Sequence, residues 1–152
     1  MDAKDLYHFG LVTDDYEGTQ AQLTALLGYR WGDEIHLTMP FAFASGETRE
    51  LTVEFCYSTG DEPRLELIRP MAGTPWQPAS AGWHHFGYWS DDVTGDGARL
   101  EQQGYEMEMF GPGPDGAPTW GYWRHPAGAR IEIVTRGPVM DQYFIDGKNP
   151  FV

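Results

Sequence analysis

The stretch Tyr7-His8-Phe9-Gly10-Leu11-Val12-Thr13-Asp14-Asp15 returns in the second half of the chain as His84-His85-Phe86-Gly87-Tyr88-Trp89-Ser90-Asp91-Asp92. The two copies are separated by about half of the 152 residues, and each carries a histidine at the same place. A repeat that occurs only twice favours a duplicated half-domain over a solenoid, which needs at least three stacked units. A duplicated strand with one histidine in each copy can bring two nitrogen ligands to one point.

The similarity continues to the end of each half. Both copies finish in a short apolar run that contains one acid, Leu65-Glu66-Leu67-Ile68 in the first and Ile131-Glu132-Ile133-Val134 in the second. The repeated sequence therefore pairs a histidine near its start with a glutamate near its end.

Composition and charge restrict the class of protein. A hydrophobic share of 41% fits a folded chain, and 152 residues fit one domain. The formal net charge of -13 predicts no nucleic-acid or membrane partner and disfavours a substrate that binds through a large basic patch. We see no signal peptide and no apolar run of about 20 residues, and the single Cys56 cannot form an internal disulfide. These features favour a cytoplasmic protein.

Local patterns predict the same order of elements in both halves. Asp14 and Asp15 stand where a helix begins, and Gly28 stands where it ends. We predict one domain over residues 6–135, with module 1 at about 6–70, a Pro- and Gly-rich linker at about 70–83, module 2 at about 84–135 and a tail at 136–152. Each module reads as βαβββ, so the fold class is α+β with eight strands in one curved mixed sheet. The predicted strands are 6–13, 34–45, 50–57, 64–69, 84–90, 105–110, 118–124 and 130–135. One predicted helix follows Asp15 and stops at Gly28, and the other runs from about 91 to 103.

Two histidines and two glutamates form the candidate metal site. An acid between aliphatic residues on a central strand is costly to bury unless another group compensates it. Acids and histidines at matching points of a repeat would compensate one another through one divalent cation, since imidazole and carboxylate both ligate such ions. Strand histidines are also often just hydrogen-bonded, and duplication alone could preserve these residues without a metal. The four residues are His8, Glu66, His85 and Glu132.

The other histidines have weaker patterns. His84 and His85 point to opposite faces of a strand, and alignment with His8 selects His85. We expect His36 to be a surface or pocket residue and His125, which precedes Pro126, to lie in a loop.

These motifs resemble the vicinal oxygen chelate superfamily, which includes glyoxalase I, methylmalonyl-CoA epimerase, extradiol dioxygenases and bleomycin- and fosfomycin-resistance proteins. The resemblance implies a central cleft lined by both modules, with a divalent metal between them. Carried over by position, the metal ligands are His8, Glu66, His85 and Glu132, a set similar to that of bacterial glyoxalase I. Zn, Ni, Co, Mn and Fe(II) all remain open, and epimerases often have Gln where Glu66 stands.

The resemblance implies proton transfer next to a metal-chelated carbonyl through an enolate, with Glu132 or Glu66 as the catalytic carboxylate. The expected protein is a metal-dependent isomerase or lyase of the glyoxalase or epimerase type. A metal-free protein that sequesters a small molecule is the alternative. An Fe(II) extradiol dioxygenase ranks lower because a fourth protein ligand would obstruct its open positions.

Aromatic residues of the second half suggest the nature of the substrate. Trp89 shares a strand face with His85, and Trp120 and Tyr122 share one face of their strand. We expect these three to line a pocket for a hydrophobic or aromatic small molecule. Relatives commonly dimerise, so a homodimer is expected, with the segment from Tyr143 to Val152 as a possible contact.

Overall fold

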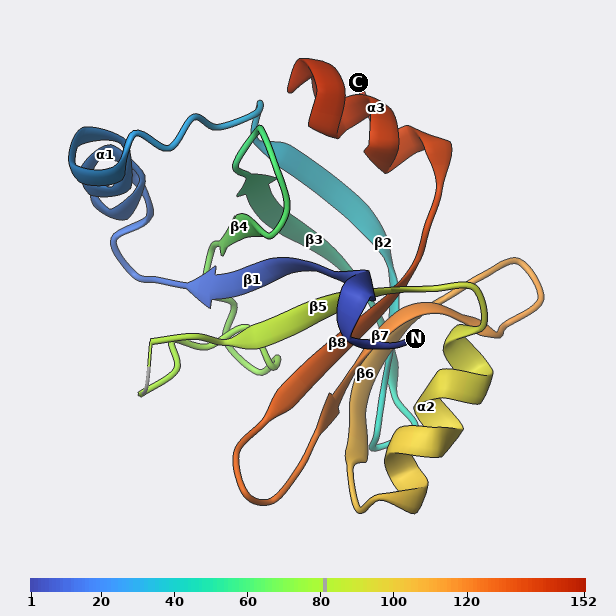
Figure 1. Ribbon diagram of the computed structural model, residues 1–152. Coiled ribbons are helices and arrows are strands. Elements are labelled where there is room, and N and C mark those ends of the chain that lie inside the picture. Colours follow the sequence, from blue (N-terminus) through green and yellow to red (C-terminus); the bar gives the residue numbers. More distant parts are fainter. Residues whose placement is uncertain (81) are drawn as a thin grey trace. The chain divides into compact units, whose positions relative to one another are not determined.

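The computed structural model describes residues 1–80 and 82–152, and its elements follow the predicted order (Figure 1). A 3₁₀ turn, Ala3–Asp5, precedes the first strand. Each half of the described chain reads βαβββ, so the predicted α+β class is confirmed. The strands are β1 Leu6–Val12, β2 Ile35–Phe43, β3 Thr48–Tyr57, β4 Arg64–Ile68, β5 His85–Ser90, β6 Glu106–Pro112, β7 Pro118–Arg124 and β8 Arg130–Thr135; the α-helices are α1 Tyr16–Leu27, α2 Val93–Gln102 and α3 Pro138–Asp146.

The eight strands are hydrogen-bonded in the order β1-β4-β3-β2-β6-β7-β8-β5. The first strand of each half pairs in parallel with the last, β1 with β4 and β5 with β8. The pairs β3–β4, β2–β6, β6–β7 and β7–β8 are antiparallel. The predicted mixed sheet of eight strands is therefore confirmed.

The chain forms two compact units that do not coincide with its two halves. The unit that we call the His85 unit contains Met1–Tyr7, Thr38–Thr52 and His85–Arg136. The His8 unit contains His8–Leu37, Val53–His84 and Gly137–Val152. Strands β1, β2 and β3 each pass from one unit into the other. The predicted bounds of a single domain, residues 6–135, stay a prediction.

In the His8 unit, helix α1 begins at Asp15, whose side chain accepts a hydrogen bond from the backbone N–H of Gly18. The helix ends at Gly28, which has a φ of 75° and so occupies the left-handed region that glycine tolerates. Tyr16 on α1, Cys56 on β3 and Leu67 on β4 are buried together. This apolar cluster packs one face of β4 on the helix and leaves the other face for Glu66.

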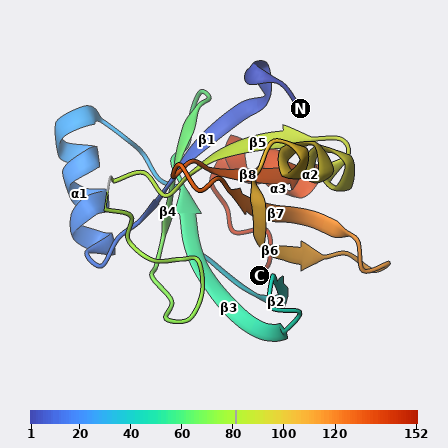
Figure 2. The same cartoon turned by 90° about the horizontal axis from the view of Figure 1, so that it is seen from below.

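The His85 unit repeats these features. Asp92 caps α2 by accepting a hydrogen bond from the N–H of Gly95, as Asp15 does for α1. Figure 1 shows α2 lying along β6 and β7, and Val93, Trp123 and Ile133 form the core beneath it. Strands β2 and β3 run side by side (Figure 2), and their turn is closed in this unit by the N–H of Phe43, which donates to the carbonyl of Glu47.

Helix α3 differs from the prediction, which assigns residues 136–152 to a tail. Pro138 opens the helix, and Gly147 ends it with a φ of 70°. Tyr143 and Phe144 are buried, whereas Ile145 is exposed. The segment therefore packs within the His8 unit of its own chain.

Among the described residues, no helix has the length and apolar character needed to cross a membrane.

Candidate functional site

His8 and Glu66 come together in the His8 unit. The parallel register of β1 and β4 places Gly10 opposite Glu66 and His8 opposite Arg64, so all these positions share one face. His8 Nε2 lies 3.4 Å from Glu66 Oε2. Both side chains are buried, with residue exposures of 0% and 5%.

His85 and Glu132 form the same arrangement in the His85 unit. Gly87 lies opposite Glu132 in the parallel pair β5–β8, which matches Gly10 opposite Glu66. His85 Nε2 lies 3.4 Å from Glu132 Oε2, and both residues are buried. The sequence repeat is thus a repeat of a side-chain pair, and each unit holds one imidazole beside one carboxylate.

The donor chemistry of both pairs fits a divalent cation. A carboxylate withdrawn from water is costly unless it is paired or coordinates a metal. His8, Glu66, His85 and Glu132 are buried residues of the types that hold such ions, and each can offer one nitrogen or oxygen atom. Nitrogen and carboxylate ligands without thiolate favour a reactive site over a closed structural zinc site.

Each glutamate also has a tyrosine directly opposite it on the neighbouring antiparallel strand. Tyr57 on β3 faces Glu66, and its ring meets His8 edge to face at 5.2 Å. Tyr122 on β7 faces Glu132, and its ring centre lies 5.0 Å from that of His85. Tyr57 is not among the predicted site residues. It lies at the end of β3, and no sequence motif marks this position.

The predicted pocket residues Trp89, Trp120 and Tyr122 all lie in the His85 unit. Trp120 packs edge to face on Tyr122 at 5.5 Å and so extends the aromatic wall beside His85. Trp89 stacks on Tyr7 at 3.6 Å between ring centres, with 10° between the planes. Their role in binding a substrate stays a prediction.

The remaining histidines make contacts outside the two histidine–glutamate pairs. His84 is buried, its N–H donates to the carbonyl of Gly10, and its Nε2 lies 2.6 Å from the carbonyl oxygen of Pro75. It therefore ties the linker to β1. His36 is exposed and lies 3.5 Å from a carboxylate oxygen of Glu54, as expected of a surface residue. His125 accepts the N–H of Ala127 in a turn, which confirms its loop position.

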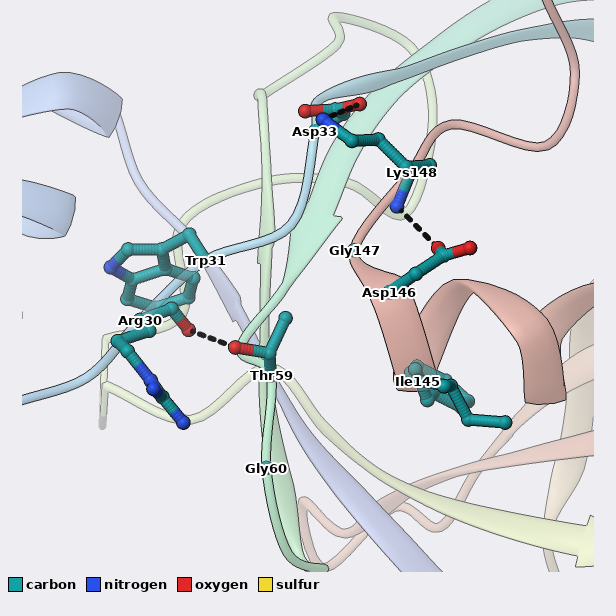
Figure 3. Close-up of a pocket in the computed structure, with 10 residues that line it drawn as sticks. Arg30, Trp31, Asp33, Thr59, Gly60, Ile145, Asp146, Gly147 and Lys148 are labelled. Atoms are coloured by element: carbon teal, nitrogen blue, oxygen red, sulfur yellow. Dashed lines mark hydrogen bonds and ion pairs between the residues drawn. The ribbon is translucent and has the colours of Figure 1, made fainter.

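A hollow of about 450 Å³ lies elsewhere in the His8 unit. Figure 3 shows Arg30 and Trp31 on one side, the end of α3 on the other, and Thr59 and Gly60 between them. Its charges are largely balanced, since Lys148 Nζ lies 3.8 Å from Asp33. Three separate segments build this hollow, so no single stretch of sequence signalled it.

Residues 7–123 match the family model of the glyoxalase/bleomycin resistance protein/dioxygenase superfamily. The chain belongs to this superfamily. The resemblance inferred from the sequence is thereby confirmed. The superfamily match ends at Trp123, so strand β8 with Glu132 lies beyond it. No curated protein sequence matches the chain.

Solved structures of similar fold include several methylmalonyl-CoA epimerases. One in complex with methylmalonyl-CoA and NH4+ has a TM-score of 0.59 at 18% identity, covering 89% of this chain and 96% of that one. A variant of the Streptomyces coelicolor enzyme in complex with 2-nitronate-propionyl-CoA has a TM-score of 0.58 at 17% identity, covering 88% and 97%. The Mycobacterium tuberculosis enzyme has a TM-score of 0.56 at 16% identity, covering 91% of each chain. At these identities the likeness shows the fold alone.

Proposed function

We propose that His8, Glu66, His85 and Glu132 together hold one divalent metal ion, and that the protein transfers a proton at a carbon next to a carbonyl group. The observation that carries the proposal is the repeated buried pair, in which a histidine nitrogen lies 3.4 Å from a glutamate oxygen in each unit. Membership of the superfamily supports it at the level of the fold and the metal. The proposed class is an isomerase, epimerase or lyase.

A bound divalent ion would polarise the carbonyl and stabilise the negative charge that develops when the adjacent carbon loses its proton. The chain itself supplies the group that moves the proton. The carboxylate of Glu132 or Glu66 takes the proton as the carbon–hydrogen bond breaks, and the resulting carboxylic acid returns it. Return to the opposite face of the same carbon gives an epimer, and return to a neighbouring atom gives an isomer, without any change of oxidation state.

The aromatic residues beside His85 are the reason for proposing that the substrate has a hydrophobic or aromatic portion. Tyr122 and Trp120 present ring surface next to the His85–Glu132 pair. Aromatic walls exclude water and strengthen the electrostatic interactions of a proton-transfer site. A small-molecule substrate is therefore proposed, and homodimerisation and a cytoplasmic location stay predictions.

Elemental analysis of purified protein tests the metal. We expect about one divalent ion per chain in the wild type, and loss of that ion in His8→Ala and in Glu132→Ala. His36→Ala is the matched control, because His36 is exposed and belongs to neither pair. A wild-type protein that holds no metal when supplied with Zn, Ni, Co, Mn and Fe(II) would favour the sequestering protein. Loss in only one of the two variants would contradict a shared ion.

Hydrogen exchange tests the reaction. Carbonyl compounds with an acidic C–H are incubated with metal-loaded protein in deuterated water, and NMR follows loss of the proton signal. Glu132→Gln and Glu66→Gln keep an oxygen ligand but cannot accept the proton. We expect the variant that lacks the base to lose about 100-fold or more in exchange rate while it retains the metal. Exchange that survives in both variants would refute a carboxylate base from this set.

A further inference from the structure

Arg64 is a backbone neighbour of the His8–Glu66 pair on strands β1 and β4. It begins strand β4, and the two-residue period puts it on the same face as Glu66. Its Cα is the register partner of His8 across the parallel pair β1–β4. The Arg64 side chain therefore leaves the backbone on the same face as both proposed metal ligands of the His8 unit.

Two contacts hold the Arg64 guanidinium in place. Its central carbon lies 4.1 Å above the ring of Phe144 on α3, and Nη1 donates a hydrogen bond of 2.8 Å to Glu62. The side chain is only 12% exposed. An arginine fixed by a ring on one side and a carboxylate at one corner has lost most of its freedom before any ligand arrives.

Among the residues that the structure describes, the opposite edge of the same guanidinium has no acceptor. Nε is buried and makes no hydrogen bond to any residue in 1–80 or 82–152, and within those residues Glu62 is the one acceptor of the group. Nε and Nη2 form a planar fork whose spacing matches the two oxygens of a carboxylate. The chain bears a formal charge of -13, so it repels an anion unless a local cation attracts it.

We propose that Arg64 determines substrate specificity by binding a carboxylate of the substrate through Nε and Nη2. The substrate class is then a carbonyl compound that also carries a carboxylate. This inference rests on the proposed function, because the carbonyl of the same molecule would occupy the proposed metal site. Arg64 acts by recognition and takes no part in the proton transfer.

Two small hydroxamates test the inference by calorimetry on zinc-loaded protein. Butanehydroxamate offers two neighbouring oxygens to the metal, and succinic monohydroxamate adds a carboxylate at the far end of the same chain. We expect the wild type to bind the carboxylated probe about tenfold more tightly, which corresponds to about 1.4 kcal/mol. In Arg64→Gln we expect this preference to disappear while the affinity for butanehydroxamate and the zinc content are unchanged.

Arg49→Gln is the matched control. The Arg49 guanidinium also stacks on a phenylalanine, 4.0 Å from the ring of Phe43, and lies 3.7 Å from the carboxylate of Glu47 two residues earlier. Arg49 lies near the start of β3 in the His85 unit, whereas Arg64 is the register partner of His8, so substitution of Arg49 should leave the tenfold preference intact. An equal loss in both variants would show a general effect of net charge and would overturn the inference.

The remaining outcomes separate this inference from the proposed function. A wild type that binds zinc and both probes equally refutes the role of Arg64 alone, whereas a wild type that binds neither zinc nor either probe refutes both. If Arg64→Gln fails to fold by circular dichroism, Arg64→Lys keeps the charge but lacks the planar fork, and it should retain only part of the preference. Full preference in Arg64→Lys would overturn recognition through the fork.

Discussion

Tyr57 lies directly opposite Glu66 in the antiparallel pairing of β3 with β4, and its ring meets the imidazole of His8 edge to face. The ring of Tyr57 also packs edge to face on Phe144 of α3, with 5.2 Å between ring centres. A single aromatic side chain thus connects the His8–Glu66 pair to the C-terminal helix. The orientation of His8 depends on this packing.

Replacement of Tyr57 by leucine should weaken metal binding by about tenfold, because groups that orient a metal ligand typically contribute 10- to 100-fold to affinity. Tyr57→Phe keeps the ring and should stay within about twofold of the wild type. Competition with a chromophoric chelator measures both affinities. Equal loss in the two variants would assign the effect to the hydroxyl and contradict a role for the ring.

Asp15→Ala and Asp92→Ala should each lower the free energy of unfolding by about 1 kcal/mol, because each removes the side-chain oxygen that caps a helix. Asp14 and Asp91 occupy the preceding positions of the repeat and are exposed. Their alanine variants are the controls and should change stability by less than about 0.5 kcal/mol. Urea unfolding gives all four values, and equal effects at capping and preceding positions would contradict the assignment.

Tyr143→Phe should destabilise the protein by about 1–3 kcal/mol. The Tyr143 hydroxyl donates to the carbonyl of Asp33 and accepts the N–H of Tyr57, so its removal leaves the buried N–H of Tyr57 and the carbonyl of Asp33 without this partner. Burial also raises the pKa of Tyr143 above its ordinary value. Tyr29→Phe is the control, since the Tyr29 hydroxyl makes no hydrogen bond to the residues that the structure describes. Similar unfolding midpoints for the two variants would refute this role.

Cys56 makes stability depend on pH in alkaline solution. Burial raises the pKa of the Cys56 thiol from about 9 to about 11. Between these values the unfolded chain loses the thiol proton while the folded chain keeps it, so ionisation favours the unfolded state and stability falls as pH rises. The loss should reach on the order of 2 kcal/mol.

Cys56→Ala cannot ionise and isolates this effect. Urea unfolding of both proteins at pH 8, 9 and 10 should show the wild type losing stability faster than the variant. Subtracting the two curves removes the contribution of tyrosines and lysines, which titrate in both proteins. Parallel curves would show that the thiol does not contribute.

The repeat predicted the architecture because its signals are local. The histidine strands, the capping aspartates and the glutamate strands each occupy short stretches with clear periodicity, and the structure places each where the alternation of the strand requires. The choice of His85 over His84 also followed from alignment, and the structure gives His84 a contact with Pro75 instead. The matching positions of His8, Glu66, His85 and Glu132 in the two halves predicted them as one ligand set, and their arrangement as two histidine–glutamate pairs is a finding of the structure.

The features that the sequence did not reveal depend on distant contacts. Helix α3 has only nine residues, and its two buried rings are stabilised by residues far away in the chain. The interaction of Phe144 with Arg64 likewise has no local signal. The convergence of the two histidine–glutamate pairs on one ion stays a prediction.

The division of β1, β2 and β3 between the two units has a consequence for how the gene can be cut. A fragment that ends in the linker would lack Gly137–Val152 of the His8 unit, and a fragment that starts in the linker would lack Met1–Tyr7 and Thr38–Thr52 of the His85 unit. We therefore expect that neither half of the coding sequence specifies an independently folding unit, although each contains one copy of the βαβββ repeat. Each compact unit needs segments from both halves of the chain, so loss of either half should prevent both units from folding.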